Sequence, residues 1–215
     1  MEKDPCPGRR AARKEDRRRA ILKVAERSFF DRGFADTSMS TIAAELGGSK
    51  TTLWSYFPSK EALFAAVLDC KIADFASALD QALISTGGAA GVLHRFGQIF
   101  LAKILSEDSR RLQRLIASEG DRFPAMSDAY YQRGPARVSQ RLALYLSREM
   151  AAGRLREGDA AMAARQFLAL CQAGAYNDRV WHRLRPDSDP ERDVEQAVDT
   201  FLRAWRAESP PPPAR

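Results

Sequence analysis

The sequence has few of the residues on which catalysis and metal binding usually depend. Its 215 residues include two histidines, His94 and His182, and three cysteines that stand far apart, without zinc-type spacing or the pattern of a disulfide framework. Cys171 lies in the apolar run FLALC and is expected in the core rather than at a redox-sensing site. No Ser/His/Asp, Cys/His or paired-carboxylate set is recognisable by spacing. We therefore expect no metal, no cofactor and no enzymatic activity.

Long apolar runs are missing as well. No run approaches the roughly 18 residues of a membrane span, and the charged N-terminus lacks the apolar core of a signal peptide. We expect a cytoplasmic protein without a membrane partner, in keeping with the reducing compartment that the cysteine usage suggests. Apolar residues nevertheless make up 45% of the chain, which is enough for a core in one domain or two modest ones.

Positive charge is concentrated at the start of the chain. Residues 1–60 hold 13 Lys and Arg against 8 Asp and Glu, whereas the remainder holds 21 against 20. The segment RRAARKEDRRR, residues 9–19, supplies seven of these basic residues. Such a segment suits a polyphosphate backbone, because binding there releases condensed counterions. A solvated charged tail is the alternative, and charge alone does not separate the two.

Apolar residues recur at intervals of three and four, and Pro and Gly fall between the periodic segments, so an all-α fold is predicted. The fourth segment is long enough, at roughly 35 to 40 Å, to join two domains as an arm. Residues 1–14 are predicted to be a disordered basic tail, and the proline-rich residues 208–215 a second tail. The expected helices span residues 15–32, 39–46, 50–56, 60–84, 92–105, 109–120, 125–133, 135–152, 159–182 and 190–206.

Residues 39–53 fit a helix-turn-helix pattern. Ala43 is small where the two helices cross, Gly47 suits the tight turn, and Ile42, Leu46 and Leu53 are placed to fill the angle between the helices. The polar residues between them then face outward, where a recognition helix meets a major groove. The same stretch contains GGSKT, which hints at a phosphate-binding P-loop, but Ser stands where that motif needs Gly and a helix leads in where it needs a strand.

At residues 20–63 the chain closely resembles the DNA-binding domain of TetR/AcrR-type transcriptional regulators. The resemblance rests on GF after the first helix, TSM-x-x-IA at the second, and LW-x-YF-PSKEAL after the third. Residues 108–174, notably RLIASEGDRFPAMSDAYYQRGPA and GRLREGDAAMAARQFLAL, resemble the AefR-like C-terminal domain of one branch of that family. The resemblance implies a helix-turn-helix domain over 15–62 and a helical ligand-binding and dimerisation domain over 63–207.

Roles in DNA binding follow from the resemblance and agree with side-chain chemistry. Lysine can reach guanine O6 and N7, and threonine can place its methyl group against thymine. Two positions depart from the family pattern: Gly48 replaces an apolar residue, and Trp54 replaces the commoner tyrosine. The residues expected to hold phosphates are Thr37, Ser38, Tyr56 and Lys60, and those expected along or near base edges are Lys50, Thr51, Thr52 and Trp54.

The resemblance also implies a ligand chamber and a two-fold dimer interface in the second domain. The same residues could instead be plain core and an ordinary pair of helices within one chain. The chamber candidates, whose aromatic character suits an apolar or aromatic molecule, are Phe75, Leu79, Phe96, Phe100, Ile104, Met126, Tyr130 and Tyr176. The interface candidates are Phe167, Leu170, Gly174, Trp181, Val194, Val198, Phe201 and Trp205.

The sequence therefore predicts a ligand-responsive transcriptional regulator. We expect a homodimeric repressor that binds a palindromic double-stranded DNA operator and is released by an unknown small-molecule effector. The alternative is a helical small-molecule-binding protein whose DNA-binding head has lost specificity. Neither effector, operator sequence nor regulated genes follow from the residues.

Overall fold

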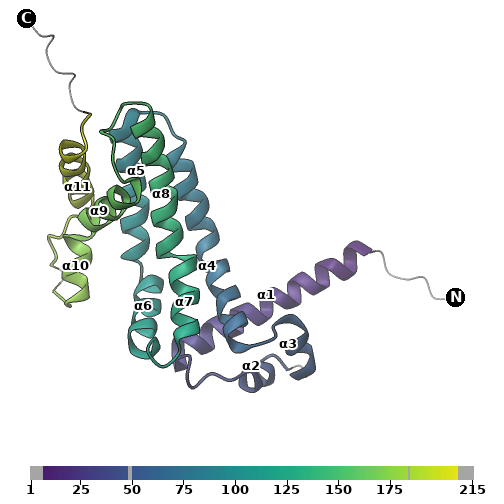
Figure 1. Ribbon diagram of the computed structural model, residues 1–215. Helices are drawn as coiled ribbons and strands as arrows, with labels where there is room; N and C mark the ends of the chain where they lie inside the picture. Colours follow the sequence, from purple (N-terminus) through teal and green to yellow (C-terminus); the bar gives the residue numbers. More distant parts are fainter. Residues whose placement is uncertain (1–6, 48–49, 184, 208–215) are drawn as a thin grey trace, which may run out of the picture. The chain divides into compact units, whose positions relative to one another are not determined.

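The computed structural model describes residues 7–47, 50–183 and 185–207. Within these ranges the regular elements are helices, with one isolated bridge between Leu155 and Arg206, so the predicted all-α class is confirmed (Figure 1). No helix in this part of the chain combines the length and apolarity that crossing a membrane requires. The helices are α1 (Pro7–Arg32), α2 (Met39–Glu45), α3 (Lys50–Tyr56), α4 (Lys60–Leu83), α5 (Gly88–Ile104), α6 (Glu107–Glu119), α7 (Pro124–Arg133), α8 (Pro135–Ala151), α9 (Ala160–Gln172), α10 (Ala175–Val180) and α11 (Pro190–Ala204).

Helix α1 is longer than predicted. Residues 7–14 were assigned to a disordered tail, but they form the first turns of this helix. Proline is favoured in a first helical turn, where its missing N–H has no partner to lose, and the Arg, Ala and Lys residues that follow are good helix formers. The predicted tail is therefore wrong for these residues, whereas residues 1–6 and 208–215 lie outside the described ranges.

One predicted helix, residues 159–182, is two helices in the structure. Helix α9 ends at Gln172, and α10 begins at Ala175 after a turn at Gly174. Asp193 of α11 accepts a hydrogen bond from the Ala175 amide at 2.7 Å, and a side chain at position 174 would overlap the Asp193 carboxylate. The break therefore depends on a tertiary partner, which helical periodicity alone does not reveal.

The chain divides into two compact units. Unit 1 contains residues up to Ile72 together with Arg111–Arg133, and unit 2 contains Ala73–Arg110 and the residues from Gly134 onward. Helices α4 and α6 each contribute residues to both units. The predicted domain boundary after residue 62 does not coincide with this division, because Leu112 and Leu115 of α6 share the buried core of the N-terminal helices.

Four phenylalanines organise the core of unit 1. The ring of Phe34, just after α1, lies 5.5 Å from Phe29, 5.5 Å from Phe64 of α4 and 5.1 Å from Phe123, measured between ring centres. Phe64 and Phe123 meet the Phe34 ring edge to face and Phe29 is stacked on it, and aromatic pairs in both arrangements stabilise beyond the area that they bury. The loop between α1 and α2 is therefore held by helices from distant parts of the sequence.

Unit 2 has its own core, built by α5, α8, α9 and α11 with the second half of α4. An aromatic series runs through it from Phe96 through Phe167 and Phe201 to Trp205, with successive ring centres 6.4, 5.3 and 6.0 Å apart. The Trp205 indole donates a hydrogen bond to the Gln166 side chain at 3.0 Å. These contacts fix α11 against α9 and α5.

Candidate nucleic-acid interface

Helices α2 and α3 meet through buried small and apolar side chains. Ser38 caps α2, because its hydroxyl accepts a hydrogen bond of 3.0 Å from the Thr41 amide. Ile42, Ala43 and Leu53 are all buried. The predicted helix-turn-helix framework therefore folds as its spacing indicates.

The turn between the two helices begins with Gly47. Its φ of +62° lies in the left-handed region, which glycine adopts without strain. The Gly47 amide bonds to the Ala44 carbonyl oxygen at 3.1 Å, three residues back instead of four, so the last turn tightens and α2 ends there. Gly48, the first of the two predicted departures from the family pattern, lies outside the described residues together with Ser49.

Helix α3 exposes a polar and aromatic face. Lys50 and Thr51 are exposed, and the side chain of Trp54 is 49% exposed although it is large and largely apolar. Thr52 and Tyr56 are half-buried at the margins of this face. The structure thus brings together on one short helix five of the eight residues predicted to contact DNA.

Thr37 does not have the predicted role of holding a phosphate with its side chain. It is 1% exposed. Its hydroxyl group can donate a hydrogen bond to two carbonyl oxygens, that of Ser28 at 3.0 Å and that of Gly33 at 2.7 Å. The side chain therefore ties the start of α2 to the end of α1. Its neighbour Ser38 is exposed and stays a predicted phosphate contact.

The Lys60 side chain, predicted to hold a phosphate, bonds within its own chain. Its Nζ donates to the Phe34 carbonyl oxygen at 2.7 Å and lies 4.3 Å from the centre of the Phe34 ring and 5.4 Å from that of Phe123. Burial lowers the pKa of Lys60, and the carboxylates of Glu61 and Glu119 act in the opposite direction. This ammonium group stabilises the α1–α2 loop from the N-terminus of α4.

Glu119, which the sequence analysis did not single out, holds the same loop from α6. Its carboxylate accepts hydrogen bonds from the Phe34 amide at 3.1 Å and the Ala35 amide at 2.6 Å. Gly33 has a φ of +91°, and a Cβ atom there would overlap the Glu119 carboxylate. An acidic residue at a helix C-terminus is unfavourable to the helix dipole, and that anomaly is the signal by which the sequence could have identified Glu119.

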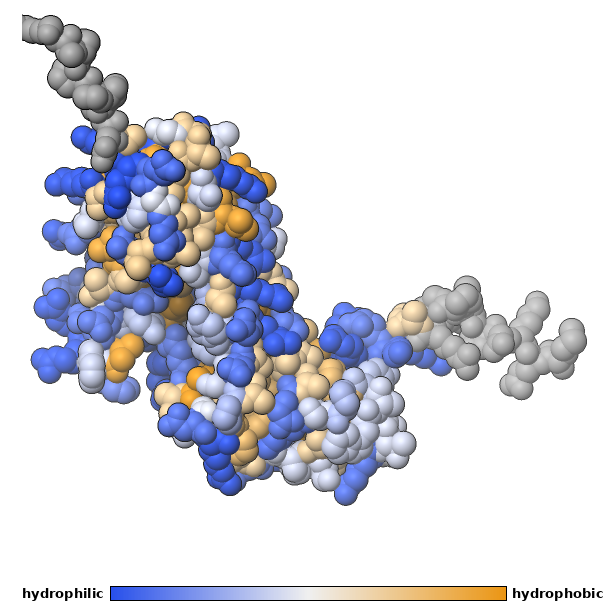
Figure 2. Space-filling model, in the orientation of Figure 1, coloured by the Kyte–Doolittle hydropathy of each residue, from blue (hydrophilic) through white to orange (hydrophobic). Residues whose placement is uncertain are grey.

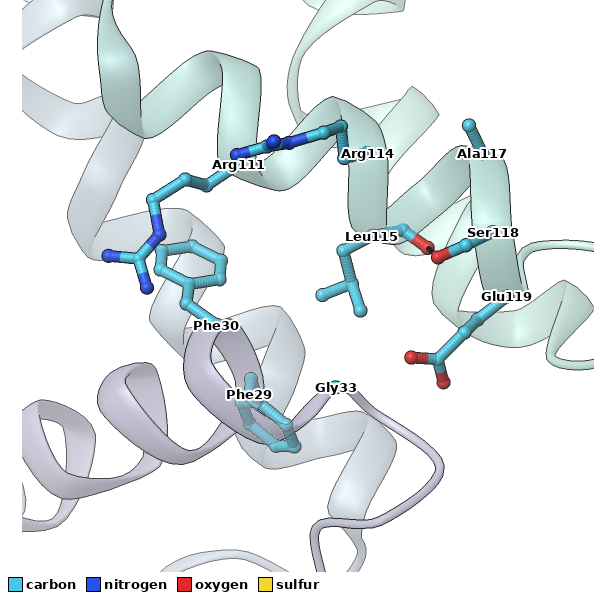
Figure 3. A pocket seen from close by; sticks show the side chains of 9 residues that line it. All are labelled: Phe29, Phe30, Gly33, Arg111, Arg114, Leu115, Ala117, Ser118 and Glu119. Carbon is cyan, nitrogen blue, oxygen red and sulfur yellow. Dashed lines mark hydrogen bonds between the residues drawn. The ribbon is translucent and has the colours of Figure 1, made fainter.

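A shallow hollow of about 580 Å³ lies between α1 and α6 within unit 1 (Figure 3). Phe29 and Phe30 come from α1, and the Arg111 side chain extends toward them from α6. Arg111 is engaged there, since it forms an ion pair of 2.5 Å with Asp31 and lies 5.7 Å from the centre of the Phe30 ring. None of the residues predicted to form a ligand chamber lines this hollow.

The eight predicted chamber residues do not form one group. Met126 is fully buried in the core of unit 1, and Tyr130 packs against that core. The other six belong to unit 2, where Leu79, Phe96 and Phe100 are buried core and the remainder pack against it: Phe75, Ile104 and Tyr176. Met126 and Tyr130 are therefore corrected to core positions of unit 1. Their aromatic and apolar character does not distinguish chamber from core.

The predicted dimer interface also contains several core residues. Five of them are between 0% and 7% exposed and pack in the core of unit 2, although Phe201 and Trp205 also reach the lining of an outward groove: Phe167, Val194, Val198, Phe201 and Trp205. Leu170 and Gly174 are half-buried, and Trp181 is 70% exposed. The apolar stripe of each helix marks the face that packs in the core of its own chain. It does not mark the solvent-exposed face, where a second chain would bind.

The outward side of α9 and α11 forms a groove of about 490 Å³, which we call the α9–α11 groove. Sequence analysis missed most of its lining, because alanine, threonine and glutamine give no periodic apolar signal. The lining residues are Gln166, Ala169, Leu170, Ala173, Thr200, Phe201, Ala204 and Trp205.

Cys171 is a core residue, as predicted. It is fully buried, and burial raises the pKa of its thiol to about 12, with a smaller contribution from the nearby Asp193 carboxylate. Such a thiol is unreactive near neutral pH. Across residues 7–47, 50–183 and 185–207, no cluster of His, Cys, Asp and Glu is arranged to hold a metal ion.

A helix-turn-helix head joined by continuous helices to a second helical unit defines the class of DNA-binding transcriptional regulators. Two family models match the chain: that of the bacterial regulatory proteins of the tetR family at residues 21–67, and that of the AefR-like transcriptional repressor C-terminal domain at residues 91–207. The chain belongs to the TetR family, in the branch with an AefR-like C-terminal domain. This family consists of transcriptional regulators and not of enzymes.

Individual relatives agree with the family models. The HTH-type transcriptional regulator EthR of Mycobacterium tuberculosis H37Rv is 47% identical over 64 residues, which span 29% of this chain and 30% of EthR. Among solved structures, the Flavonoid-responsive Regulator FrrA is 30% identical, with a TM-score of 0.78 over 91% of this chain and 100% of that one. A TetR-family regulator from Mesorhizobium loti is 26% identical, with a TM-score of 0.76 over 92% and 98%.

Proposed function

We propose that this regulator is a homodimeric repressor that binds a palindromic operator and releases it when a small apolar or aromatic molecule binds unit 2. The observation on which the proposal rests is the exposed face of α3, where Lys50, Thr51 and Trp54 project from a framework whose own apolar residues are buried. Lysine can donate to guanine, threonine can contact thymine, and the indole can lie against a sugar or phosphate. Thr52, Tyr56 and Ser38 complete the proposed contact set, from which Thr37 and Lys60 are removed.

The α9–α11 groove supports a dimer as the binding species. Ala169 on α9, Ala173 directly after it and Ala204 at the end of α11 are small enough for a second pair of helices to approach closely, and Leu170 adds a partly exposed apolar contact. A self-complementary surface of this kind suits two-fold symmetry, which a palindromic site requires. We propose that two copies of the chain associate through this groove.

Coupling between effector and DNA is proposed to act through α4 and α6. Each of these helices has residues in both units, and each contacts the Phe34 segment in unit 1, through Lys60 and Glu119. An effector that binds one arrangement of unit 2 more tightly than another would shift the population of DNA-binding arrangements by that difference in affinity. FrrA, described as flavonoid-responsive, supports an aromatic effector class.

Selection from random double-stranded DNA tests the proposal. We expect enrichment of an inverted repeat that is bound by two chains, as measured by light scattering of the complex. If no sequence is enriched while small aromatic molecules still bind, the protein is the alternative, a small-molecule-binding protein with a degenerate head. If a single half-site is enriched by a monomer, the dimeric part of the proposal is wrong.

The effector class can be tested separately. A panel of flavonoids, simple phenols and charged metabolites would be added to the protein bound to its selected DNA, with release followed by fluorescence anisotropy. We expect release by aromatic compounds and none by charged ones. Release by charged metabolites alone would overturn the proposed effector class without affecting the assignment of α3.

A further inference from the structure

We propose that the hollow of about 580 Å³ between α1 and α6 binds an aromatic hydroxy acid, a molecule with a carboxylate at one end of a ring system and a phenolic hydroxyl at the other. We call this site the α1–α6 hollow. Its lining residues all belong to unit 1, whereas the proposed effector binds unit 2. Binding in the hollow needs neither DNA nor the proposed function of α3.

Helix α6 places a cation, an apolar side chain and an anion in one row along the hollow. Arg111, Leu115 and Glu119 are four residues apart, so they fall on one side of the helix, and the row is about 12 Å long at about 1.5 Å per residue. Figure 3 shows these three side chains on the side of α6 that faces α1. A ligand that lies along the row therefore meets a hydrogen-bond donor at one end and an acceptor at the other.

The Arg111 guanidinium can exchange its present partner for a ligand carboxylate. One of its nitrogen atoms donates to Asp31, whose side chain is 61% exposed, and no other oxygen of the described residues accepts from this group. An exposed ion pair contributes little to stability, so Asp31 can return to water at small cost. Guanidinium groups bind carboxylates through pairs of parallel N–H bonds. Arg114 lines the same end of the hollow and adds positive charge there.

The middle of the hollow is apolar. Phe30 from α1 and Leu115 from α6 line it on opposite sides, and Ala117 leaves its rim open because the side chain is small (Figure 3). Elsewhere near α6, the face of the molecule shown in Figure 2 is mainly hydrophilic. The volume lies within the range of small-molecule sites, about 300 to 1,000 Å³. An aromatic ring placed here would pack against the Phe30 ring and the Leu115 side chain.

The other end of the hollow offers acceptors. The Glu119 carboxylate already accepts from the amides of Phe34 and Ala35, but a carboxylate has about four acceptor positions, so a phenolic hydroxyl can donate to it as well. The Ser118 hydroxyl donates to the Leu115 carbonyl oxygen at 3.2 Å, and its oxygen can still accept. A hydroxyl group therefore suits this end of the hollow.

The two ends together define the ligand class. A neutral aromatic molecule would leave the Arg111 guanidinium without a carboxylate to bind. A dicarboxylate would place its second negative charge beside the Glu119 carboxylate, where like charges repel. An aromatic hydroxy acid satisfies both ends, since it carries one charge for Arg111 and one neutral donor for Glu119.

A series of naphthalene derivatives tests this class. Binding of hydroxynaphthoate, naphthoate, naphthol and naphthalene dicarboxylate to the full chain would be measured by the anisotropy of their own fluorescence. We expect hydroxynaphthoate to bind tightest, naphthoate at least threefold more weakly, and naphthol and the dicarboxylate at least tenfold more weakly. Equal affinity for naphthol and hydroxynaphthoate would overturn the proposed role of the carboxylate.

Three variants locate the bound probe. R111Q should weaken hydroxynaphthoate binding at least tenfold and leave naphthol binding unchanged, because only the contact with the carboxylate is lost. The control R137Q removes the same charge from an exposed position of α8, outside the hollow, and should bind as the parent does. A117W fills the hollow from its exposed rim and should weaken binding of every probe at least tenfold. Circular dichroism would verify that each variant keeps its helices.

The outcomes separate this hollow from other aromatic sites. If R111Q and A117W both bind hydroxynaphthoate as the parent does, the probe binds elsewhere and the α1–α6 hollow is not its site. If R111Q weakens naphthol as much as hydroxynaphthoate, Arg111 does not hold the carboxylate and the proposed recognition is wrong. If no probe binds the parent, the proposal fails. Each of these failures leaves the proposed function of α3 untouched, because no measurement includes DNA.

Discussion

The Lys60 ammonium donates a hydrogen bond of 2.7 Å to the carbonyl oxygen of Phe34 and lies 4.3 Å from the centre of the Phe34 ring. Sequence similarity implied a phosphate contact for this lysine, but its geometry is that of a group that stabilises a loop within its own chain. The salt dependence of DNA binding distinguishes these two roles of Lys60, because its slope increases with the number of phosphate contacts.

Lysine-to-methionine variants at positions 60 and 50 are expected to behave differently. K60M should lower the free energy of unfolding by about 1 to 2 kcal/mol, because a cation–π contact and a charge-assisted hydrogen bond are lost. It should leave the slope of log K against log salt unchanged. K50M should leave stability unchanged and reduce affinity at particular base pairs by about 1 to 3 kcal/mol. A slope that falls by about 1 per subunit in K60M would restore the phosphate role.

Glu119 is expected to couple to Gly33 in a double-mutant cycle. E119Q keeps the size of the side chain but turns an amide group toward one of the two backbone N–H groups, so we expect a loss of about 1 to 3 kcal/mol in unfolding free energy. G33A should cost more, because it adds both a clash and a strained φ. E119A should lessen the cost of G33A by removing the clash alone. If the losses in unfolding free energy caused by E119A and G33A simply add in the double variant, the proposed contact between the two positions is contradicted.

Substitutions in the α9–α11 groove should separate dimerisation from folding. A173E places a charge in the groove without disturbing the core, since Ala173 is exposed, and should give a folded monomer by light scattering. F201D places an unpaired charge in the core, because Phe201 is 0% exposed, and should unfold unit 2. S147E, on the exposed surface of α8 and outside the groove, is the matched control and should stay dimeric. A dimeric A173E variant would place the interface elsewhere.

Alkaline pH should destabilise the protein through Cys171. Burial raises the pKa of its thiol from 9.0 to about 12, so the native state keeps a proton that the unfolded state loses above pH 9. The contribution of the neutral thiol is therefore complete below pH 9 and is lost between pH 9 and about 12, at about 1.4 kcal/mol per pH unit.

Denaturant titrations between pH 8 and 10.5 check this dependence. C171V should show a shallower loss of stability with pH than the parent, because one titrating group is gone. Cys70 is exposed, and C70S should follow the parent curve. A C171V curve parallel to that of the parent would show that the thiol does not contribute.

The limits of α2 and α3 were predictable because each boundary has a local cause. Ser38 caps α2, Gly47 takes a left-handed turn, and the limits predicted for α3 match those observed. The break at Gly174 was not predictable, since it depends on Asp193, which lies 18 positions after Ala175 and accepts a hydrogen bond from its amide. Sequence signals predict a helix end only where the residue that causes the end lies nearby in the sequence.

The site was predictable in its chemistry more than in its contacts. The five predicted residues of α3 lie together, because a single short helix fixes their relation. Thr37 and Lys60 bond to backbone groups of their own chain, and sequence alone does not distinguish such a partner from a phosphate. Periodicity likewise places Phe201 and Trp205 on one apolar stripe of α11, but it does not show which element packs against that stripe.

The two left-handed glycines of the head should differ in how freely they vary among related chains. Among the described residues, no atom lies within 4 Å of a Cβ atom added at Gly47, so asparagine, which tolerates a positive φ, is an acceptable replacement there. Gly33 has a positive φ, and the end of the Glu119 side chain lies where a Cβ atom would be, so a substitution there strains the backbone and also displaces the carboxylate that holds the loop. In a saturation library selected for DNA binding, position 33 should retain glycine much more often than position 47 does.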